Sequence, residues 1–409
     1  MPGTVRIAWR SLWRNRRRTA LALAAIGLSQ ALVLFYDGIM RGYGDWMVAV
    51  ITGPMLGHAQ AHAPGWRRER SVDLVLPRAG RALAAIRGLP EVAQASARVW
   101  APALAALGED GHAVVVVGLD PAAEAHRHGL LAGAAPGALA GREVLVGRLL
   151  AEKMGIRPGA TLALVGQAAD GSLANDLVRV AGLLDTSVDE VNRLGVVMSL
   201  PAAQELFALG DAAHELVIHA RDPAKAPEVA ARAARLPELA GAEVLDWKSL
   251  DPGLVSIVAL VRASGLFILL LVFVAAAAGV ANTMLMATFE RTHELGMLLA
   301  LGVTPRRVVG LVVAEALALG LTGAALGTAL GGALVALTHA RGFDLARLMG
   351  GGPAQLSFAG LRMSMRFYPS LGWVELVQSF GAVAVTSLLA AGWPAARAAR
   401  LEPARAMRG

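Results

Sequence analysis

Few residues in this sequence have the types and spacing that catalysis or phosphate binding requires. The chain has three lysines, Lys153, Lys225 and Lys248, and none follows a glycine, so no P-loop for nucleotide phosphates is present. Cysteine is absent, which excludes thiolate metal sites and a cysteine nucleophile. The sequence also lacks a G-x-S-x-G nucleophile elbow. We therefore expect no covalent chemistry, and no cofactor, in this chain.

The histidines do not have the spacing of a zinc site. His214 and His219 lie five residues apart, whereas a zinc-protease helix needs its two histidines four apart on one face. The residues between them, Leu216–Ile218, favour a strand. Two further pairs lack acidic or cysteine neighbours, and we interpret them as surface residues: His58 and His62, and His126 and His128. We expect no metal site.

The segment 289–302 has a pattern suited to docking. Leu295, Leu298 and Leu299 lie at i, i+3 and i+4, which predicts one apolar face of a short helix. Gly302 can end that helix, and Thr304 can cap the next one with Pro305 at its first position. Such a face needs either a protein partner or the membrane interface, and composition does not separate these two alternatives.

The elements that carry this segment are membrane helices. Hydrophobic residues make up 56% of the chain, and a helix needs roughly 20 apolar residues to cross the hydrocarbon core. Four stretches qualify: residues 19–40, about 263–288, about 308–338 and about 374–393. Glu315 lies inside the third, where a carboxylate is costly. For it we favour a structural partner, such as a helix end or a nearby arginine, over proton transport.

The arginines predict the orientation of these helices. Arg6, Arg10, Arg14 and Arg16–Arg18 precede the first span and the chain ends in an arginine-rich tail, so both termini are predicted to be cytoplasmic. Residues 1–18 also have the pattern of an amphipathic helix on the cytoplasmic leaflet. The loop 339–373 disagrees, because it should lie outside yet carries four arginines and one aspartate. We keep this topology because the termini agree with the connection after the second span, which holds Arg291, Arg306 and Arg307. The chain is thus expected to be a multi-pass protein of the inner membrane.

The large segment 41–255 is predicted to lie outside the cytoplasm. It carries 20 basic and 24 acidic residues, whereas the rest of the chain carries 18 basic and 7 acidic ones. This slightly acidic charge, with few aromatic residues, argues against nucleic-acid binding. Short β-branched runs alternate with helical patterns, so we expect an α+β domain inserted between helices 1 and 2. Residues 121–205 are predicted to be a subdomain inserted within it.

The sequence resembles a known family at three places. Glu290-Arg291, Glu294-Leu295-Gly296 and Ala300-Leu301-Gly302 match the E-R-x-x-E-[IL]-G-x-x-x-A-L-G signature of FtsX/MacB-type ABC permeases. The tail Trp393–Pro403 is similar to the P-A-x-x-A-[AS]-R-[LI]-x-P ending of that family, and Ile7–Thr19 looks like its opening. By this resemblance, residues 41–255 are a MacB-like periplasmic core domain and residues 256–409 an FtsX-like permease domain.

The resemblance implies a permease that works by mechanotransmission with a separate ABC ATPase dimer. ATP and Mg²⁺ would be bound by that partner, and a second permease copy or a paralogue would complete the complex. The segment 289–302 would be the coupling helix. Its candidate ATPase-coupling residues are Glu290, Arg291, Glu294, Leu295, Gly296, Leu298, Leu299, Ala300, Leu301 and Gly302.

For the substrate, the lipoprotein-releasing branch of the family is the most similar, so we expect release of a lipoprotein or another amphiphile from the membrane. A cleft between spans one and two would admit it, lined by Phe35, Asp37, Phe267 and Leu271. Two alternatives stay open: regulation of an envelope hydrolase by the outer domain, and efflux of a small molecule or peptide.

Overall fold

The computed structural model describes residues 16–126, 129–132, 139–348, 355–358, 361–364 and 366–400. The amphipathic helix predicted over residues 1–18 therefore lies outside the described residues, apart from its last three. The chain divides into two compact units. We call Met1–Trp46, Ile257–Leu345 and Arg366–Gly409 the helical unit, and Met47–Ser256 and Ala346–Met365 the sheet unit.

The sheet unit has nine strands in one sheet. Its strands are β1 (Ala59–His62), β2 (Val92–Leu107), β3 (Asp110–Leu119), β4 (Glu143–Gly147), β5 (Thr161–Gln167), β6 (Leu173–Leu184), β7 (Gly195–Ser199), β8 (Glu215–Ala220) and β9 (Glu243–Asp246). Its helices are η1 (Thr52–Leu56), α3 (Trp66–Glu69), α4 (Ala79–Arg87), α5 (Pro121–Glu124), α6 (Arg148–Met154), α7 (Asp189–Leu194), α8 (Leu200–Leu206), η2 (Pro223–Lys225), α9 (Ala226–Ala233), η3 (Pro237–Leu239) and α10 (Trp247–Leu250). A small hairpin, β11 (Gln355–Phe358) and β12 (Leu361–Ser364), also belongs to it.

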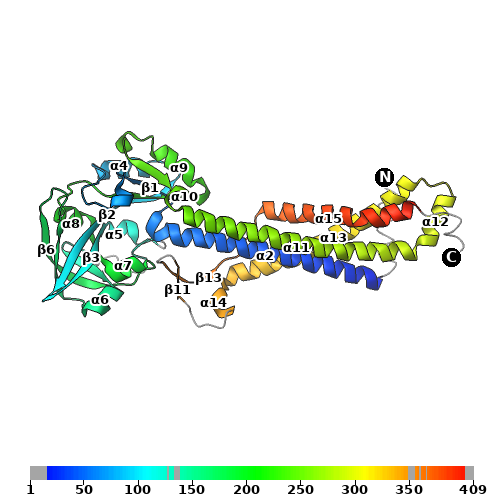
Figure 1. Ribbon diagram of the computed structural model, residues 1–409, viewed down its shortest axis with the longest axis horizontal. Helices are drawn as coiled ribbons and strands as arrows, with labels where there is room; N and C mark the ends of the chain where they lie inside the picture. The colour runs from blue at the N-terminus through cyan, green and yellow to red at the C-terminus, as the bar shows by residue number, and fades with distance from the viewer. Residues whose placement is uncertain are drawn as a thin grey trace. The chain divides into compact units, whose positions relative to one another are not determined.

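Strand β2 joins two parts of this sheet (Figure 1). Its second half, Arg98–Leu107, pairs with β3, and residues 103–106 pair with β5. Through β7, β4 and β6 these pairings close a ring of strands. Its first half pairs with β8, and β8 and β9 both pair with β1. The α+β character predicted for this segment is confirmed, with parallel β3–β7 and β4–β6 pairs in an otherwise antiparallel sheet.

Two hydrophobic cores correspond to these two parts. One fills the ring and includes Val116, Val146, Leu164 and Val196. The other lies under β1 and β8 and includes Ile86, Leu216 and Ile218. The strands described in residues 121–205, β4 to β7, all belong to the ring, and β2 and β3 complete it. The inserted subdomain stays a prediction, with the qualification that its strands belong to one continuous sheet.

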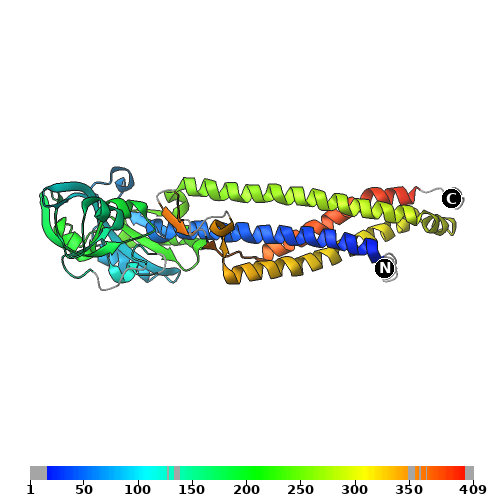
Figure 2. The same cartoon turned by 90° about the horizontal axis from the view of Figure 1, so that it is seen from below.

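The helical unit consists of long helices that run alongside one another (Figures 1 and 2). They are α2 (Arg16–Ile51), α11 (Pro252–Glu290), α13 (Pro305–Arg341) and α15 (Trp373–Ala399). A short helix, α12 (Thr292–Ala300), lies between α11 and α13; α14 (Leu345–Leu348) follows α13, and β10 (Phe343–Asp344) pairs with β13 (Arg366–Phe367). Residues from all four long helices share one core that includes Ile26, Val280, Leu319 and Val383.

Three segments of the described residues are long and apolar enough to cross a membrane: Thr19–Leu56, Pro305–Arg341 and Trp373–Ala399. The predicted second span lies within α11, a helix of 39 residues. Apolar side chains also face outward on these helices, among them Leu28 on α2, Leu330 on α13 and Leu389 on α15. An exposed apolar surface around a helical core is what lipid contact requires.

A glycine stripe on α13 packs against α2. Gly323, Gly327 and Gly331 recur every four residues, and a Cβ on any of them would clash with α2 backbone or side chains, including Ile26 and Ala31. These three glycines therefore pack α13 against α2 and not against α15. Only Gly320, one turn earlier, faces α15 at Ser387. Small residues thus allow α2 and α13 to approach closely.

We expect Gly327→Ala to destabilise the helical unit by about 1–3 kcal/mol, because the new methyl group would overlap the Gly27 carbonyl oxygen and lie 2.6 Å from Gln30 Cβ. Gly332→Ala is the matched control. Its Cβ would meet nothing within 4 Å, so the change should stabilise the helix by roughly 0.5–1 kcal/mol. Thermal unfolding of the purified chain in detergent measures both. Equal melting temperatures for the two variants would contradict this packing.

Candidate functional site

The coupling segment, residues 289–302, contains the end of α11 and the whole of the short helix α12. α11 ends at Glu290, Arg291 adopts a non-helical conformation and α12 begins at Thr292. At the other end the Val303 N–H donates to the Leu298 carbonyl (3.0 Å) and the Gly302 N–H to that of Leu299 (3.1 Å). Those two bonds form a Schellman motif, and Gly302 at φ +88° provides the left-handed residue it needs.

The start of α13 is only partly as expected. Pro305 is its first residue, as the sequence predicts, and Thr304 has the extended conformation of an N-cap. However, the Thr304 side chain makes no capping hydrogen bond, so that detail of the prediction was wrong. The rigid Pro305 ring alone pre-sets the first turn of α13.

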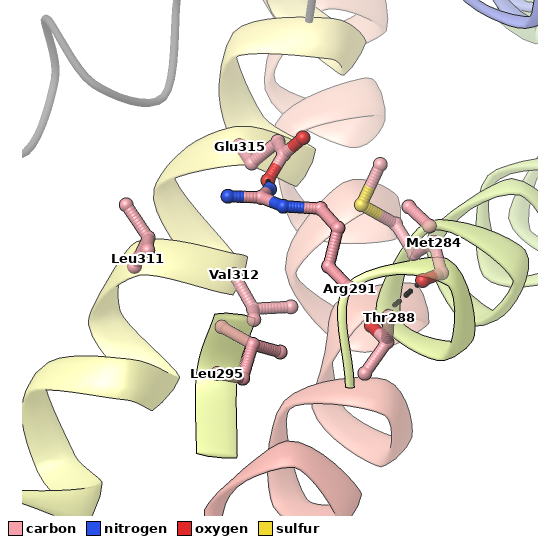
Figure 3. Close-up of a pocket in the computed structure, with 8 residues that line it drawn as sticks. Met284, Thr288, Arg291, Leu295, Leu311, Val312 and Glu315 are labelled. Atoms are coloured by element: carbon pink, nitrogen blue, oxygen red, sulfur yellow. Dashed lines mark hydrogen bonds and ion pairs between the residues drawn. The ribbon is translucent and has the colours of Figure 1, made fainter. Parts of the chain in front are cut away.

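Arg291 links the start of α12 to α13 through an ion pair with Glu315 (Figure 3). Its guanidinium lies 2.8 Å from a carboxylate oxygen of Glu315 on α13 and 3.1 Å from one of Glu294 on α12. The Glu315 side chain is only 6% exposed, whereas that of Glu294 is 42% exposed. The arginine partner favoured for Glu315 is therefore present, and the ion pair neutralises a carboxylate that lies within a long apolar helix.

The space beside this ion pair is too small for a ligand. The cavity bounded by Met284, Thr288, Leu295, Leu311 and Val312 (Figure 3) measures about 10 Å³. That is at the lower limit of what one water molecule needs, roughly 10–15 Å³. The site is therefore a packed junction between helices and not a binding pocket.

The apolar residues of α12 face two directions. Leu295 is 2% exposed and packs with Val308 and Val312 of α13 and with Ala395 and Ala398 of α15. Leu298 and Leu299 are half-buried against the same cluster. The opposite face exposes Met297, Ala300 and Leu301, and Leu301 is 76% exposed. The leucine face predicted to meet a partner is thus mostly covered by the chain's own helices.

The tail of α15 belongs to the same site. The Arg397 guanidinium lies 4.6 Å above the Phe289 ring, at the end of α11, and 5.7 Å from the Trp393 ring. These distances suit cation–π contacts. Both motifs are visible in the sequence, but the contact between Arg397 and Phe289 was not predicted. The i, i+4 spacing of Trp393 and Arg397 was the available signal.

The residues predicted for a substrate cleft lie on α2 and α11. Phe267 and Leu271 on α11 are 63% and 55% exposed, and Phe35 and Asp37 on α2 are half-buried. A Cβ on Gly265 would lie 3.8 Å from the Tyr36 ring, so the two helices approach one another near this level. The cleft itself stays a prediction.

His58, His62, His126, His214 and His219 lie in the sheet unit. Leu216–Ile218 are in β8, as predicted, but His62 is fully buried and so is not a surface residue. The His58 and His126 rings each contact that of His219. Burial, together with the neighbouring His126 and His58, lowers the pKa of His219 to about 3. In the described part of the chain, no group of three or more metal-ligating side chains is arranged to hold an ion.

Two family models match the chain. The model of the MacB-like periplasmic core domain matches residues 19–236, and that of the FtsX-like permease C-terminal domain matches residues 266–403. Together they cover both units and the coupling segment.

Individual relatives are more distant. The pyoverdine export ATP-binding/permease protein PvdT of Pseudomonas syringae pv. tomato (strain ATCC BAA-871 / DC3000) is 26% identical over 98% of this chain, which spans 59% of that relative's length. The extracellular domain of the noncanonical ABC-type transporter YknZ from Gram-positive bacteria covers 46% of the chain at 14% identity, with 98% of that domain matched and a TM-score of 0.34. The periplasmic region of MacB from Actinobacillus actinomycetemcomitans covers 50% at 10% identity, with 95% of that region matched and a TM-score of 0.34.

We expect Arg291→Ala to destabilise the helical unit by about 3–5 kcal/mol, because it leaves the buried Glu315 without its guanidinium. Glu294→Gln should change stability by at most about 1 kcal/mol, since that carboxylate is partly exposed. Arg291→Met combined with Glu315→Met should recover most of the loss. Denaturant midpoints of the full chain in mixed micelles test this series. If Arg291→Ala is as mild as Glu294→Gln, the ion pair does not hold the junction.

Proposed function

The chain belongs to the family of FtsX/MacB-type ABC permeases, and on that premise we propose that it is the membrane subunit of an ATP-driven exporter. It is a membrane permease with a periplasmic MacB-like domain and several apolar helices. The observation that carries the proposal is the outward apolar face of α12, held to α13 by the Arg291–Glu315 ion pair.

We assign four membrane spans to α2, α11, α13 and α15, with both termini in the cytoplasm of a cell with an inner membrane. The arginine distribution supports this orientation, and α11 is long enough to cross, at 39 residues. The sheet unit then lies in the periplasm. α12 lies at the cytoplasmic face, where a separate ATPase can reach it.

The mechanism we propose is mechanotransmission through α12. Two ATPase copies bind ATP and Mg²⁺, and each docks on Met297, Ala300 and Leu301 of one permease copy. Closure of the ATPases displaces α12. Because Leu295 and Arg291 fix α12 to α13 and α15, that displacement moves the helical unit rather than α12 alone. A second permease copy or a paralogue would complete the complex.

For the substrate we propose an amphiphile drawn from the membrane, with lipoprotein as the expected class and Phe35, Asp37, Phe267 and Leu271 as its entry. The exposed apolar side chains of Phe267 and Leu271 support this entry. Efflux of a small molecule or peptide is the second candidate, favoured by the relative named as a pyoverdine export protein.

We expect Leu301→Asp to release the ATPase from the complex. A tenfold loss of binding affinity corresponds to roughly 1.4 kcal/mol, and burying an unpaired carboxylate costs well over that. The amount of ATPase that stays bound should therefore fall at least about tenfold. Co-purification of the ATPase through a tag on this chain measures the effect. Leu298→Asp would test folding and not docking, because Leu298 packs against other residues of the same protomer.

Leu173→Asp is the matched control for this experiment. Leu173 is also a strongly exposed leucine, at 68%, but it lies on β6 in the sheet unit. Its substitution should leave the ATPase bound. Wild-type ATPase stoichiometry with Leu301→Asp would show that α12 is an interfacial helix and not a docking site.

The topology predicts which introduced cysteines are reactive from outside. The chain has no cysteine of its own, so single substitutions give a clean background. In intact spheroplasts lacking the ATPase, a membrane-impermeant maleimide should label Glu109→Cys, at the exposed β2–β3 turn. It should label Ala300→Cys only after permeabilisation. Labelling of both sites in intact spheroplasts would rule out the proposed topology.

A further inference from the structure

The sheet unit contains a cavity that the coupling mechanism does not use. It measures about 240 Å³ and is walled by residues from η1, α3, β2, β3, α7 and β8, with Gln60 of β1. This is far more than one water needs, roughly 10–15 Å³. It is somewhat less than the roughly 300–1,000 Å³ of pockets that hold drug-sized ligands. The cavity therefore suits one end of a larger molecule, or a small molecule.

Two arginines supply positive charge to the wall. The Arg67 guanidinium donates one hydrogen bond to the Leu250 carbonyl (2.7 Å), which fixes its position. The Arg70 guanidinium lies 4.4 Å above the ring of the buried Trp66. A guanidinium has five N–H donors in a planar fork that matches a carboxylate or a phosphate. Both side chains are thus held in place with donors left for a ligand.

The carboxylates of the wall do not cancel this charge completely. Glu215 is buried; it accepts a hydrogen bond from the Trp100 indole (3.0 Å) and lies 3.6 Å from the Arg98 guanidinium. Burial raises its pKa, an effect that Arg98, the Trp100 hydrogen bond and Arg70 oppose. Glu215 thus interacts with Arg98 and Trp100 as well as with Arg70, and its charge is shared among them. The other acid, Glu190, is exposed, as Arg70 is, so water screens both of these charges.

Apart from Gln60, the remaining wall is apolar. It is lined by Trp100, Val115, Pro102, Met55 and Leu56. The wall thus combines a flat indole and apolar side chains with two guanidiniums. That combination matches a molecule with an anionic end and a short apolar segment.

We propose that this cavity binds the head of an anionic amphiphile, with its carboxylate or phosphate on Arg67 and Arg70 and its apolar segment against Trp100 and Val115. The site lies wholly within the sheet unit and needs no ATPase. Its test is therefore independent of the docking assigned to α12.

The experiment is equilibrium dialysis of labelled hexanoate and hexyl phosphate against the full chain in lipid nanodiscs, with empty nanodiscs as the blank. Short chains keep partition into lipid low. We expect saturable binding at one site per chain, with hexanol at least about tenfold weaker because it lacks the charge that the arginines pair with. The tighter of the two anions identifies the head group, carboxylate or phosphate.

Arg70→Gln should weaken binding of the anions at least about tenfold. Arg68→Gln is the matched control, because Arg68 lies on α3, two residues before Arg70, and is exposed but does not line this cavity. Val115→Phe, which fills the apolar side, should abolish binding without changing elution or thermal melting. Uptake that does not saturate, or that falls equally with Arg68→Gln and Arg70→Gln, would overturn the proposal.

Discussion

The helical unit depends on the ion pair between Arg291 and Glu315. A charged group among apolar helices is stable only where an opposite charge accompanies it. Arg291 occupies the single non-helical position between α11 and α12, and Glu315 lies on α13. Separating α12 from α13 would therefore break the contact between the Arg291 guanidinium and the Glu315 carboxylate, although Glu294 would stay beside Arg291. This contact joins α13 to the junction of α11 and α12.

The sheet unit uses the same chemistry at its own junction. Arg98 is fully buried at the residue of β2 that pairs with both β8 and β3, and its guanidinium binds Glu124 at 2.7 and 2.8 Å. Glu215 on β8 lies on its other side. Replacing Arg98 with a shorter side chain would take its guanidinium away from both Glu124 and Glu215. In both units, an arginine paired with a carboxylate thus joins neighbouring elements: Arg291 with Glu315 on α13, and Arg98 on β2 with Glu124 on α5.

Local signals in the sequence predicted much of this fold. The apolar runs lie within long helices, Gly302 ends α12, and Pro305 begins α13. Prediction failed where a sequence pattern does not show which side of a helix is covered, or which neighbour covers it. Apolar residues occur on every side of α12, so periodicity could not tell the covered Leu295 from the exposed Leu301. The glycine stripe required a close neighbour but did not identify α2. The sequence of β2 does not predict a strand, because it is rich in alanine, which has a high helix propensity. The cavity in the sheet unit could not be predicted, because its walls come from elements that are distant in sequence.

The pairing of β1 has a consequence for how the protein is made. β1 follows directly on α2 and η1, yet its partners β8 and β9 are the last strands of the nine-stranded sheet to be synthesised. At roughly 5–20 residues per second, β9 emerges on the order of ten seconds after β1. The strands of the ring are contiguous in the chain between Val92 and Ser199, so the ring can close during that interval. The edge of β1 meanwhile remains unpaired, so another chain could pair with it during that interval.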